Sequence, residues 1–140
     1  MFRRSVLAIA ALIVACPAWA DDAPDLSGTY RMEGKGFGPN DSAYEGSCTL
    51  TFREAIYRHG AVYDVSCFNE DTRHTYVGEG LASGDRLAIF IGDELKGDHN
   101  AIFTGEYLVL YERQADGSFS GAWLHAQGPA AGAETLKPMN

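Results

Sequence analysis

Short runs of β-branched and aromatic residues recur along most of the chain, and they constrain the fold more than any other feature of the sequence. The runs are rich in Tyr, Phe, Val, Ile and Thr and are bounded by Gly, Asp or Asn. Such runs are typical of strands between turns, and the repeat of an amphipathic helix is nearly absent after residue 20. We therefore expect eight strands, at Leu26–Lys35, Tyr44–Arg53, Ala61–Asn69, His74–Leu81, Arg86–Ile91, Gly105–Arg113, Ser118–Ala126 and Glu134–Pro138.

The connections between these strands are short and evenly spaced, which favours antiparallel neighbours in a meander. Gly84-Asp85 and Asp116-Gly117 are typical hairpin turns. Glycines also recur inside the strands, as in Val77-Gly78-Glu79-Gly80 and Ser120-Gly121-Ala122-Trp123, where they indicate bulges or the sharp bends that a small barrel needs. The sequence therefore predicts an all-β chain that forms a single eight-stranded antiparallel up-and-down β-barrel.

Two cysteines allow a test of the hairpin between the second and third strands. Directly opposed residues of a hairpin have position numbers with a constant sum, and pairing Cys48 with Cys67 sets that sum at 115. Because this register also brings apolar residues together on one face, it predicts a disulfide between the two cysteines. The further apolar pairs in this register are Leu50 with Val65 and Phe52 with Tyr63.

The first twenty residues are typical of a secretory signal peptide. Phe2-Arg3-Arg4 is basic, Val6–Ala15 is apolar, and Ala18-Trp19-Ala20 fits a small-x-small cleavage site. We expect a signal peptide over residues 1–20, a single barrel domain over 21–140, and a periplasmic or secreted protein. The apolar run is shorter than the roughly twenty residues that span a bilayer.

Cys16 leaves an alternative open, because Ile13-Val14-Ala15-Cys16 resembles a bacterial lipobox in which the cysteine is acylated. Ala18-Trp19-Ala20 followed by two aspartates is the fuller match to a cleavage site, so cleavage after Ala20 is favoured over a lipid anchor. Either event removes Cys16 from pairing inside the domain. The two remaining cysteines in an oxidising compartment favour a bridge over a metal pair.

The expected mature chain is strongly acidic. It keeps all nineteen acidic residues and nine of the eleven basic ones, because Arg3 and Arg4 leave with the signal, and its formal charge is therefore −10. A charge of this sign argues against nucleic acid or an anionic membrane surface as a partner.

Residue patterns of catalytic and metal sites are incomplete in this chain. Gly117-Ser118-Phe119-Ser120-Gly121 has Phe at the centre, where a nucleophile elbow needs Ser. The four histidines are scattered without His-x-x-x-His spacing. Residues 92–100 gather oxygen-bearing side chains that would suit calcium, but Lys96 and the spacing depart from a calcium loop and favour a solvated loop. We therefore expect a protein that is not an enzyme and has no metal or cofactor.

Aromatic residues at alternating strand positions are the most suggestive functional feature. The interior of an eight-stranded barrel is either filled by side chains or wide enough for one small ligand. A domain of this length favours a filled interior, and the functional alternative is a shallow aromatic-lined pocket at one mouth. The candidate ligand-lining residues are Tyr63, Tyr76, Tyr107, Tyr111, Phe119 and Trp123.

Several of these motifs together resemble a known architecture. Leu26-Ser27-Gly28-Thr29-Tyr30 resembles the Gly-x-Trp first strand of lipocalin-like and avidin-like barrels, with Tyr30 in place of the usual Trp. The stretch from Tyr63 to Leu136 is similar to a group of small exported bacterial β-barrel proteins. The residues that carry this second resemblance are Tyr76–Gly80, Gly84–Ile89, Asp116–Trp123 and Glu134–Leu136.

The resemblance implies an architecture more than a chemistry, so two functions stay open. The first is a non-enzymatic binding protein of the cell envelope that holds a small apolar or amphipathic ligand at a barrel mouth. The second is a periplasmic protease inhibitor or another module that binds an envelope protein. Some bacterial inhibitors with a similar outline insert an N-terminal arm into the protease, and here Asp21–Asp25 would be that arm.

Overall fold

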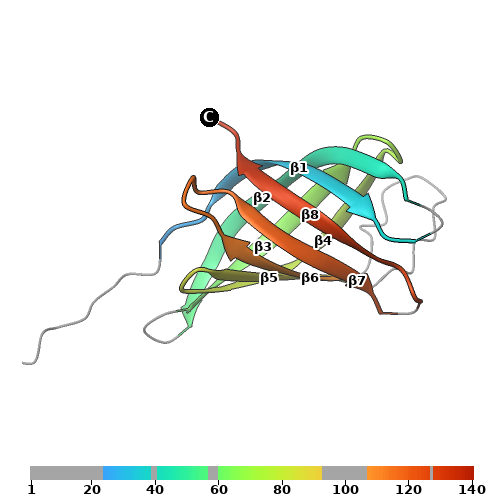
Figure 1. Cartoon of the computed structure of the whole chain (residues 1–140). Coiled ribbons are helices and arrows are strands. Elements are labelled where there is room, and N and C mark those ends of the chain that lie inside the picture. Colours follow the sequence, from blue (N-terminus) through green and yellow to red (C-terminus); the bar gives the residue numbers. More distant parts are fainter. Residues whose placement is uncertain (1–23, 39–40, 57–59, 93–106, 127) are drawn as a thin grey trace, which may run out of the picture.

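The computed structural model describes residues 24–38, 41–56, 60–92, 107–126 and 128–140, and within them it confirms the predicted all-β barrel. The strands pair antiparallel in sequence order, and β8 closes the barrel on β1 (Figure 1). These residues contain no helix, and hence none that could cross a membrane. The strands are β1 (Gly28–Gly36), β2 (Ala43–Ile56), β3 (Gly60–Asn69), β4 (His74–Ser83), β5 (Arg86–Ile91), β6 (Tyr107–Arg113), β7 (Phe119–His125) and β8 (Ala131–Pro138).

The strand boundaries lie within three residues of the predicted ones, and the start of β8, which differs by three, is the informative difference. The strand was expected from Glu134, but it begins at Ala131. Alanine and glycine favour strands only weakly. This segment is nevertheless paired on both sides, with Leu124 opposite Ala131 on β7 and Gly36 opposite Gly132 on β1. Ladder hydrogen bonds from two neighbours therefore extend a strand that its own residues would not predict.

The β2–β3 hairpin confirms the predicted register and the disulfide. Cys48 lies opposite Cys67 and is bonded to it, and the two predicted apolar pairs are also present. The register shifts by one residue after Phe52, at a β-bulge near the end of the barrel. A bridge that closes a loop of this length stabilises the folded chain by about 3 kcal/mol.

Two of the strand glycines are not at bulges, which was one of the two predicted roles. In the strand pairs that are described, the register does not shift at Gly78 or at Gly121. A Cβ at Gly78 would instead collide with the carbonyl oxygen of Phe90, and one at Gly121 with that of Leu110. The two glycines therefore permit a close approach of neighbouring strands, which is a second way of bending a sheet tightly.

One half of the barrel interior is filled, and we call it the packed half. Its end is closed by Leu26, which is 4% exposed and is held by two tyrosines. The Tyr30 hydroxyl donates to the carbonyl oxygen of Leu26 at 2.8 Å, and the Leu26 N–H donates to the Tyr63 hydroxyl at 3.1 Å. The residues that fill this half are Leu26, Tyr30, Leu50, Tyr63, Leu87, Phe119 and Leu136.

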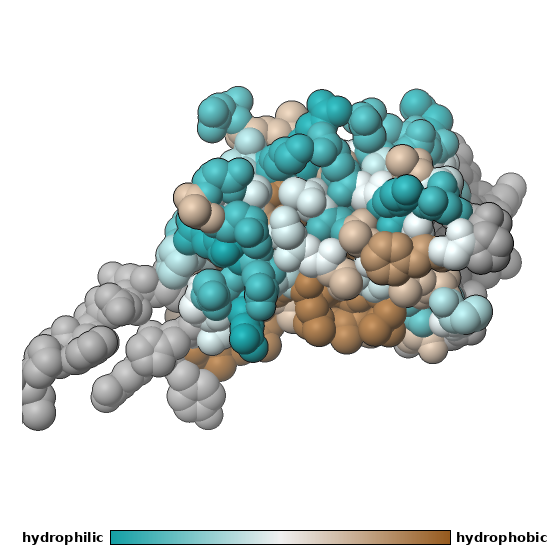
Figure 2. All heavy atoms as spheres, in the orientation of Figure 1, coloured by the Kyte–Doolittle hydropathy of each residue, from teal (hydrophilic) through white to brown (hydrophobic). Residues whose placement is uncertain are grey.

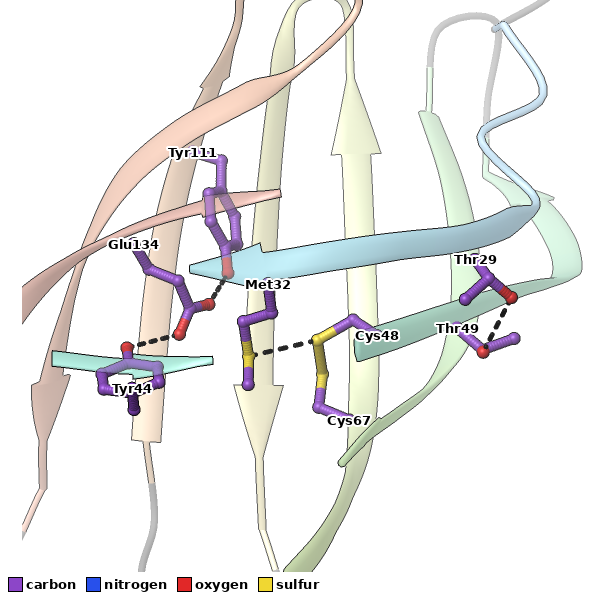
Figure 3. Close-up of a disulfide and its surroundings, with 8 residues drawn as sticks. All are labelled: Thr29, Met32, Tyr44, Cys48, Thr49, Cys67, Tyr111 and Glu134. Carbon is purple, nitrogen blue, oxygen red and sulfur yellow. Dashed lines mark hydrogen bonds between the residues drawn. A yellow bond between two sulfur atoms is a disulfide. The ribbon is translucent and has the colours of Figure 1, made fainter. Parts of the chain in front are cut away.

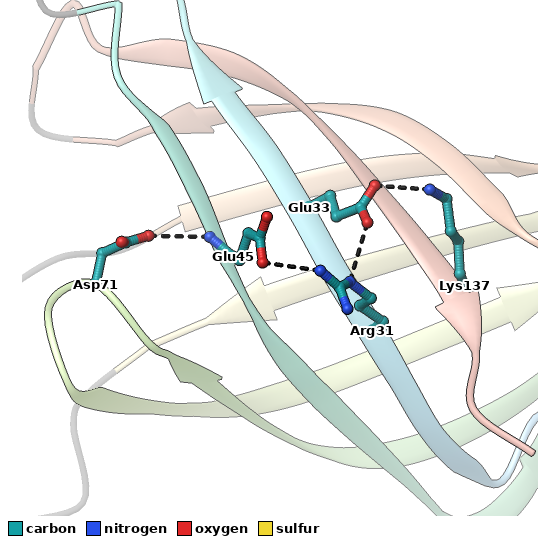
Figure 4. Close-up of polar contacts among 5 residues, drawn as sticks. All are labelled: Arg31, Glu33, Glu45, Asp71 and Lys137. Atoms are coloured by element: carbon teal, nitrogen blue, oxygen red, sulfur yellow. Dashed lines mark hydrogen bonds and ion pairs between the residues drawn. The ribbon is translucent and has the colours of Figure 1, made fainter.

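The outside of β1, β2 and β8 carries a network of charges (Figure 4). Arg31 contacts Glu33 at 3.0 Å and Glu45 at 2.8 Å, and Lys137 contacts Glu33 at 2.6 Å. All four side chains are well exposed, so the network contributes more to solubility than to stability.

The outside of β4 to β7 carries an apolar patch by contrast. Leu81, Phe90, Leu110 and Leu124 are each about half exposed. Strand pairing makes them neighbours, because Ala88 lies between Leu81 and Leu110, and Leu108 lies between Phe90 and Leu124. Figure 2 shows apolar side chains gathered on the lower part of the molecule, over β7 and its neighbours. We call this surface the apolar outer face.

Candidate functional site: an aromatic pocket in the barrel

The other half of the barrel interior contains a cavity of about 500 Å³, and we call it the open half. The cavity lies at the end of the barrel where the chain turns from β1 to β2, from β3 to β4 and from β7 to β8. Phe37, Thr72 and Pro129 from these three connections line its rim. The pocket is therefore formed by inward-facing strand residues below and by connecting residues above.

Small residues at inward positions explain why this half is hollow. Gly34 lies opposite Tyr44 in the β1–β2 pair, and Gly132 lies opposite Trp123 in the β7–β8 pair. A Cβ at Gly34 would collide with the ring of Tyr44, and one at Gly132 with the indole of Trp123. Each ring therefore lies across the backbone of the neighbouring strand, so it forms a wall of the pocket.

Aromatic side chains from neighbouring strands meet at the mouth of the pocket. The ring of Tyr107 packs edge-on against Tyr76 at 6.1 Å, Trp123 at 5.8 Å and His125 at 4.8 Å between ring centroids. Edge-to-face pairs at these distances are favourable beyond the area that they bury. The mouth is thus a connected set of rings, with Tyr107 at its centre.

A carboxyl group that lines the same cavity lies between two tyrosines (Figure 3). Glu134 on β8 receives a hydrogen bond from the Tyr44 hydroxyl at 2.6 Å on one oxygen, and one from the Tyr111 hydroxyl on the other. These three residues lie on β8, β2 and β6, and all of them line the pocket. The side chain of Glu134 therefore links three strands from the inside.

Burial dominates the acid–base behaviour of this group. It raises the pKa of Glu134 above its ordinary value, and the two tyrosine hydrogen bonds oppose that rise. The pKa values of Tyr44 and Tyr111 are also raised, first by burial and then by the neighbouring Glu134 carboxylate. Both phenols therefore keep their protons at neutral pH and act as donors.

The indole N–H of Trp123 is a second polar feature of the pocket. Its nitrogen is buried, and among the described atoms no acceptor receives its hydrogen in bonding geometry. It lies near the Tyr44 hydroxyl, and this contact acts to lower the pKa of Tyr44. A buried N–H without an acceptor costs free energy, so it favours a ligand or a water molecule that accepts from it.

Sulfur atoms form part of the pocket floor. Met32 Sδ lies 3.6 Å from Cys48 Sγ, next to the bridge to Cys67 (Figure 3). Met32 and Cys67 both line the cavity. The disulfide therefore lies where the packed half meets the open half.

The structure divides the six predicted ligand-lining residues between the two halves. Tyr76, Tyr107, Tyr111 and Trp123 line the pocket, whereas Tyr63 and Phe119 are buried in the packed half. The hydroxyl of Tyr63 bonds to the backbone of Leu26 and Pro24 at the closed end. Whether any of these residues binds a ligand stays a prediction.

Sequence reasoning missed Glu134 and Tyr44. Both follow the alternation of their strands, since Glu134 is two residues from Gly132 and from the buried Leu136, and Tyr44 is two from the buried Gly46. A glutamate in phase with the inward residues of a strand was the available signal. In the sequence alone, Glu134 stands out only as the first residue of the closing motif Glu134–Leu136.

No group of metal-ligating side chains large enough to hold an ion occurs in the described part of the chain. The loop weighed above as a calcium site lies outside the described residues, apart from Gly92. The described lining of the pocket offers aromatic rings, one carboxyl group, the indole N–H of Trp123, and the polar side chains of Ser42, Asn69 and Thr72.

The chain matches no protein-family model, and it matches no curated protein sequence. The eight-stranded antiparallel barrel is compatible with a lipocalin-like barrel. The finer resemblance to lipocalin-like and avidin-like proteins therefore stays a prediction.

Proposed function

We propose that this protein is a non-enzymatic binding protein of the cell envelope that holds a small apolar or amphipathic molecule in the open half of its barrel. The observation that supports this proposal is the cavity of about 500 Å³ beside a packed half. Small-molecule sites typically measure roughly 300 to 1,000 Å³ and have apolar walls with a few polar groups. The proposed location rests on the first twenty residues, which lie outside the described part of the chain.

Physical chemistry favours occupation of such a pocket. A ligand that removes the rings of Tyr107 and Trp123 from water gains about 25 cal/mol for each Å² of apolar surface buried. Because the walls are held by strand pairing on both sides, the pocket needs little ordering when a ligand enters. The buried Trp123 N–H offers one directional contact that a ligand with a hydrogen-bond acceptor would use.

Binding of the neutral dye N-phenyl-1-naphthylamine, measured by its fluorescence, tests the proposal. We expect saturable binding of one dye molecule per chain. The substitution Ile91→Trp should weaken that binding at least about tenfold, because Ile91 lines the cavity and an indole there would fill it.

Phe90→Trp is the matched control, because Phe90 precedes Ile91 on β5 and points outward, where it is 48% exposed. Dye binding should survive this change. Thermal unfolding of both variants shows whether either has lost its fold. Equal dye affinity in the parent and in a folded Ile91→Trp variant would refute the pocket as the binding site.

The alternative function, a protease inhibitor or another protein-binding module, stays a prediction. Its expected arm, Asp21–Asp25, lies outside the described residues except for Pro24 and Asp25. Those two residues are exposed and precede the buried Leu26, which closes the packed half. Deleting residues 21–25 would abolish inhibition by such an arm and leave dye binding in the open half intact.

A further inference from the structure

The pocket contains one acidic group without a cationic partner among the described residues. The ion pairs of those residues involve exposed side chains on the outer surface, and Glu134 takes part in none of them. Among the described residues that line the cavity, Glu134 is the sole carboxylate, and no lysine or arginine accompanies it. A carboxylate that is partly withdrawn from water is costly without an opposite charge beside it, so a cation that entered the pocket would be favoured.

The hydrogen bonds at Glu134 suit an ionised carboxylate. Each of its oxygens accepts from a different tyrosine hydroxyl, Tyr44 on one side and Tyr111 on the other. Two neutral donors stabilise a negative charge without cancelling it.

The walls of the pocket favour positive charge as well. The faces of Tyr and Trp rings carry negative potential and attract ammonium groups, with Trp the strongest. Tyr44, Tyr76, Tyr107 and Trp123 all border the cavity that contains Glu134. The Glu134 carboxylate and the aromatic rings therefore both attract a cation that enters the pocket.

We infer that the open half binds an organic ammonium ion with an apolar body, with the cation against Glu134 and the body against the rings of Tyr107 and Trp123 that line the cavity. This inference rests on the proposed function, because it names the ligand class for the same pocket. The Trp123 N–H, a neutral donor, would take an oxygen atom of the ligand or a water molecule and does not balance the carboxylate.

Three probes with the same phenyl body separate charge from apolar contact. They are 2-phenylethylamine, 2-phenylethanol and 3-phenylpropanoate, which at pH 7 are a cation, a neutral molecule and an anion. Trp123 is the single tryptophan of the chain from Asp21 onward, so its fluorescence reports on the pocket directly. We expect the amine to bind at least about tenfold more tightly than the alcohol, which is the factor typical of a charge-assisted hydrogen bond. The anion should bind most weakly.

The variant Glu134→Gln keeps the shape of the side chain and removes its charge. It should bring the affinities for the amine and the alcohol close together, with the affinity for the alcohol little changed. Glu45→Gln is the matched control: it removes one carboxylate next to Tyr44 on β2, but on the outer face. This control should keep the preference for the amine.

The outcomes separate this inference from the proposed function. If the parent protein binds the naphthylamine dye but binds the amine no better than the alcohol, the ammonium inference is wrong and the binding pocket stands. If it binds neither the dye nor any phenyl probe, both are wrong. A preference for the amine that survives Glu134→Gln, or that is lost equally in Glu45→Gln, also overturns the role of Glu134. The comparison of probes in the parent protein needs no variant to fold.

Discussion

The two halves of the barrel interior are built from the same eight strands, yet one is filled and the other is hollow. In the packed half the inward positions hold large side chains such as Leu50, Tyr63 and Phe119, which are at most 2% exposed. In the open half, inward positions of β1 and β8 hold Gly34 and Gly132, and the large rings lie against the wall. The contrast shows that inward glycines help to decide where a small barrel has room for a ligand, because a glycine leaves inside the barrel the space that a large side chain would fill.

Replacing one aromatic residue by alanine in each half should give the largest contrast. Phe119→Ala removes a ring that packs against Tyr30 and Tyr111, and it should lower the free energy of unfolding by about 3 to 5 kcal/mol. Trp123→Ala should cost less than half of that, because the indole borders a cavity and is only partly buried. Urea unfolding measures both values. Equal losses would mean that the two halves do not differ in packing.

The disulfide at the boundary between the halves should have the next largest effect. Replacing Cys48 and Cys67 together by alanine should cost about 3 kcal/mol, since the bridge closes a loop between residues 19 positions apart. Urea unfolding of the oxidised parent and the double variant gives the difference. Adding a reductant should then destabilise the parent and leave the variant unchanged; a reductant effect on the variant would point to another cause.

Glu134 in the open half should make the free energy of unfolding depend on pH. This effect should be smaller than the two above. Burial raises the pKa of Glu134 above the value in the unfolded chain, so the folded protein binds more protons between the two values. The free energy of unfolding should therefore fall as the pH rises from about 4.5 through the raised pKa. Tyr44 and Tyr111, which face the carboxyl group, keep their protons throughout this range.

Glu134→Gln should lack this loss of stability, because the amide does not titrate. The measurement is the difference in unfolding free energy between parent and variant at a series of pH values from 4 to 8. We expect the parent to lose stability relative to the variant as the pH rises. A difference that is constant, or that grows in favour of the parent at higher pH, would show that burial of the charge is not the dominant influence on this group.

The parts of the fold that could be predicted are those that depend on residues close together in the sequence. Alternation and turn residues determined the strands, and the spacing of Cys48 and Cys67 determined the register of one hairpin. The meeting of Tyr44, Tyr111 and Glu134 could not be predicted in this way. Glu134 is 90 positions from Tyr44 and 23 from Tyr111, and closure of the barrel alone decides which inward residues face one another.

The division of the aromatic residues was hidden from the sequence for the same reason. Tyr63 and Tyr76 both occupy inward positions of neighbouring strands, but one lies toward the closed end and the other toward the mouth. Alternation assigns a face of the sheet and says nothing about height along the barrel axis. Height follows from the stagger of all eight strands, which no single hairpin specifies.

The most direct test of the account is a map of backbone and indole NMR shifts on titration with the naphthylamine dye. The account predicts that the largest changes fall on the Trp123 Nε1–H and on the residues of the open half, such as Tyr76 and Tyr107, while Leu50 and Leu136 in the packed half stay unchanged. Changes centred instead on Phe90 and Leu110 would place the ligand on the apolar outer face and contradict the claim that the open half is the binding site.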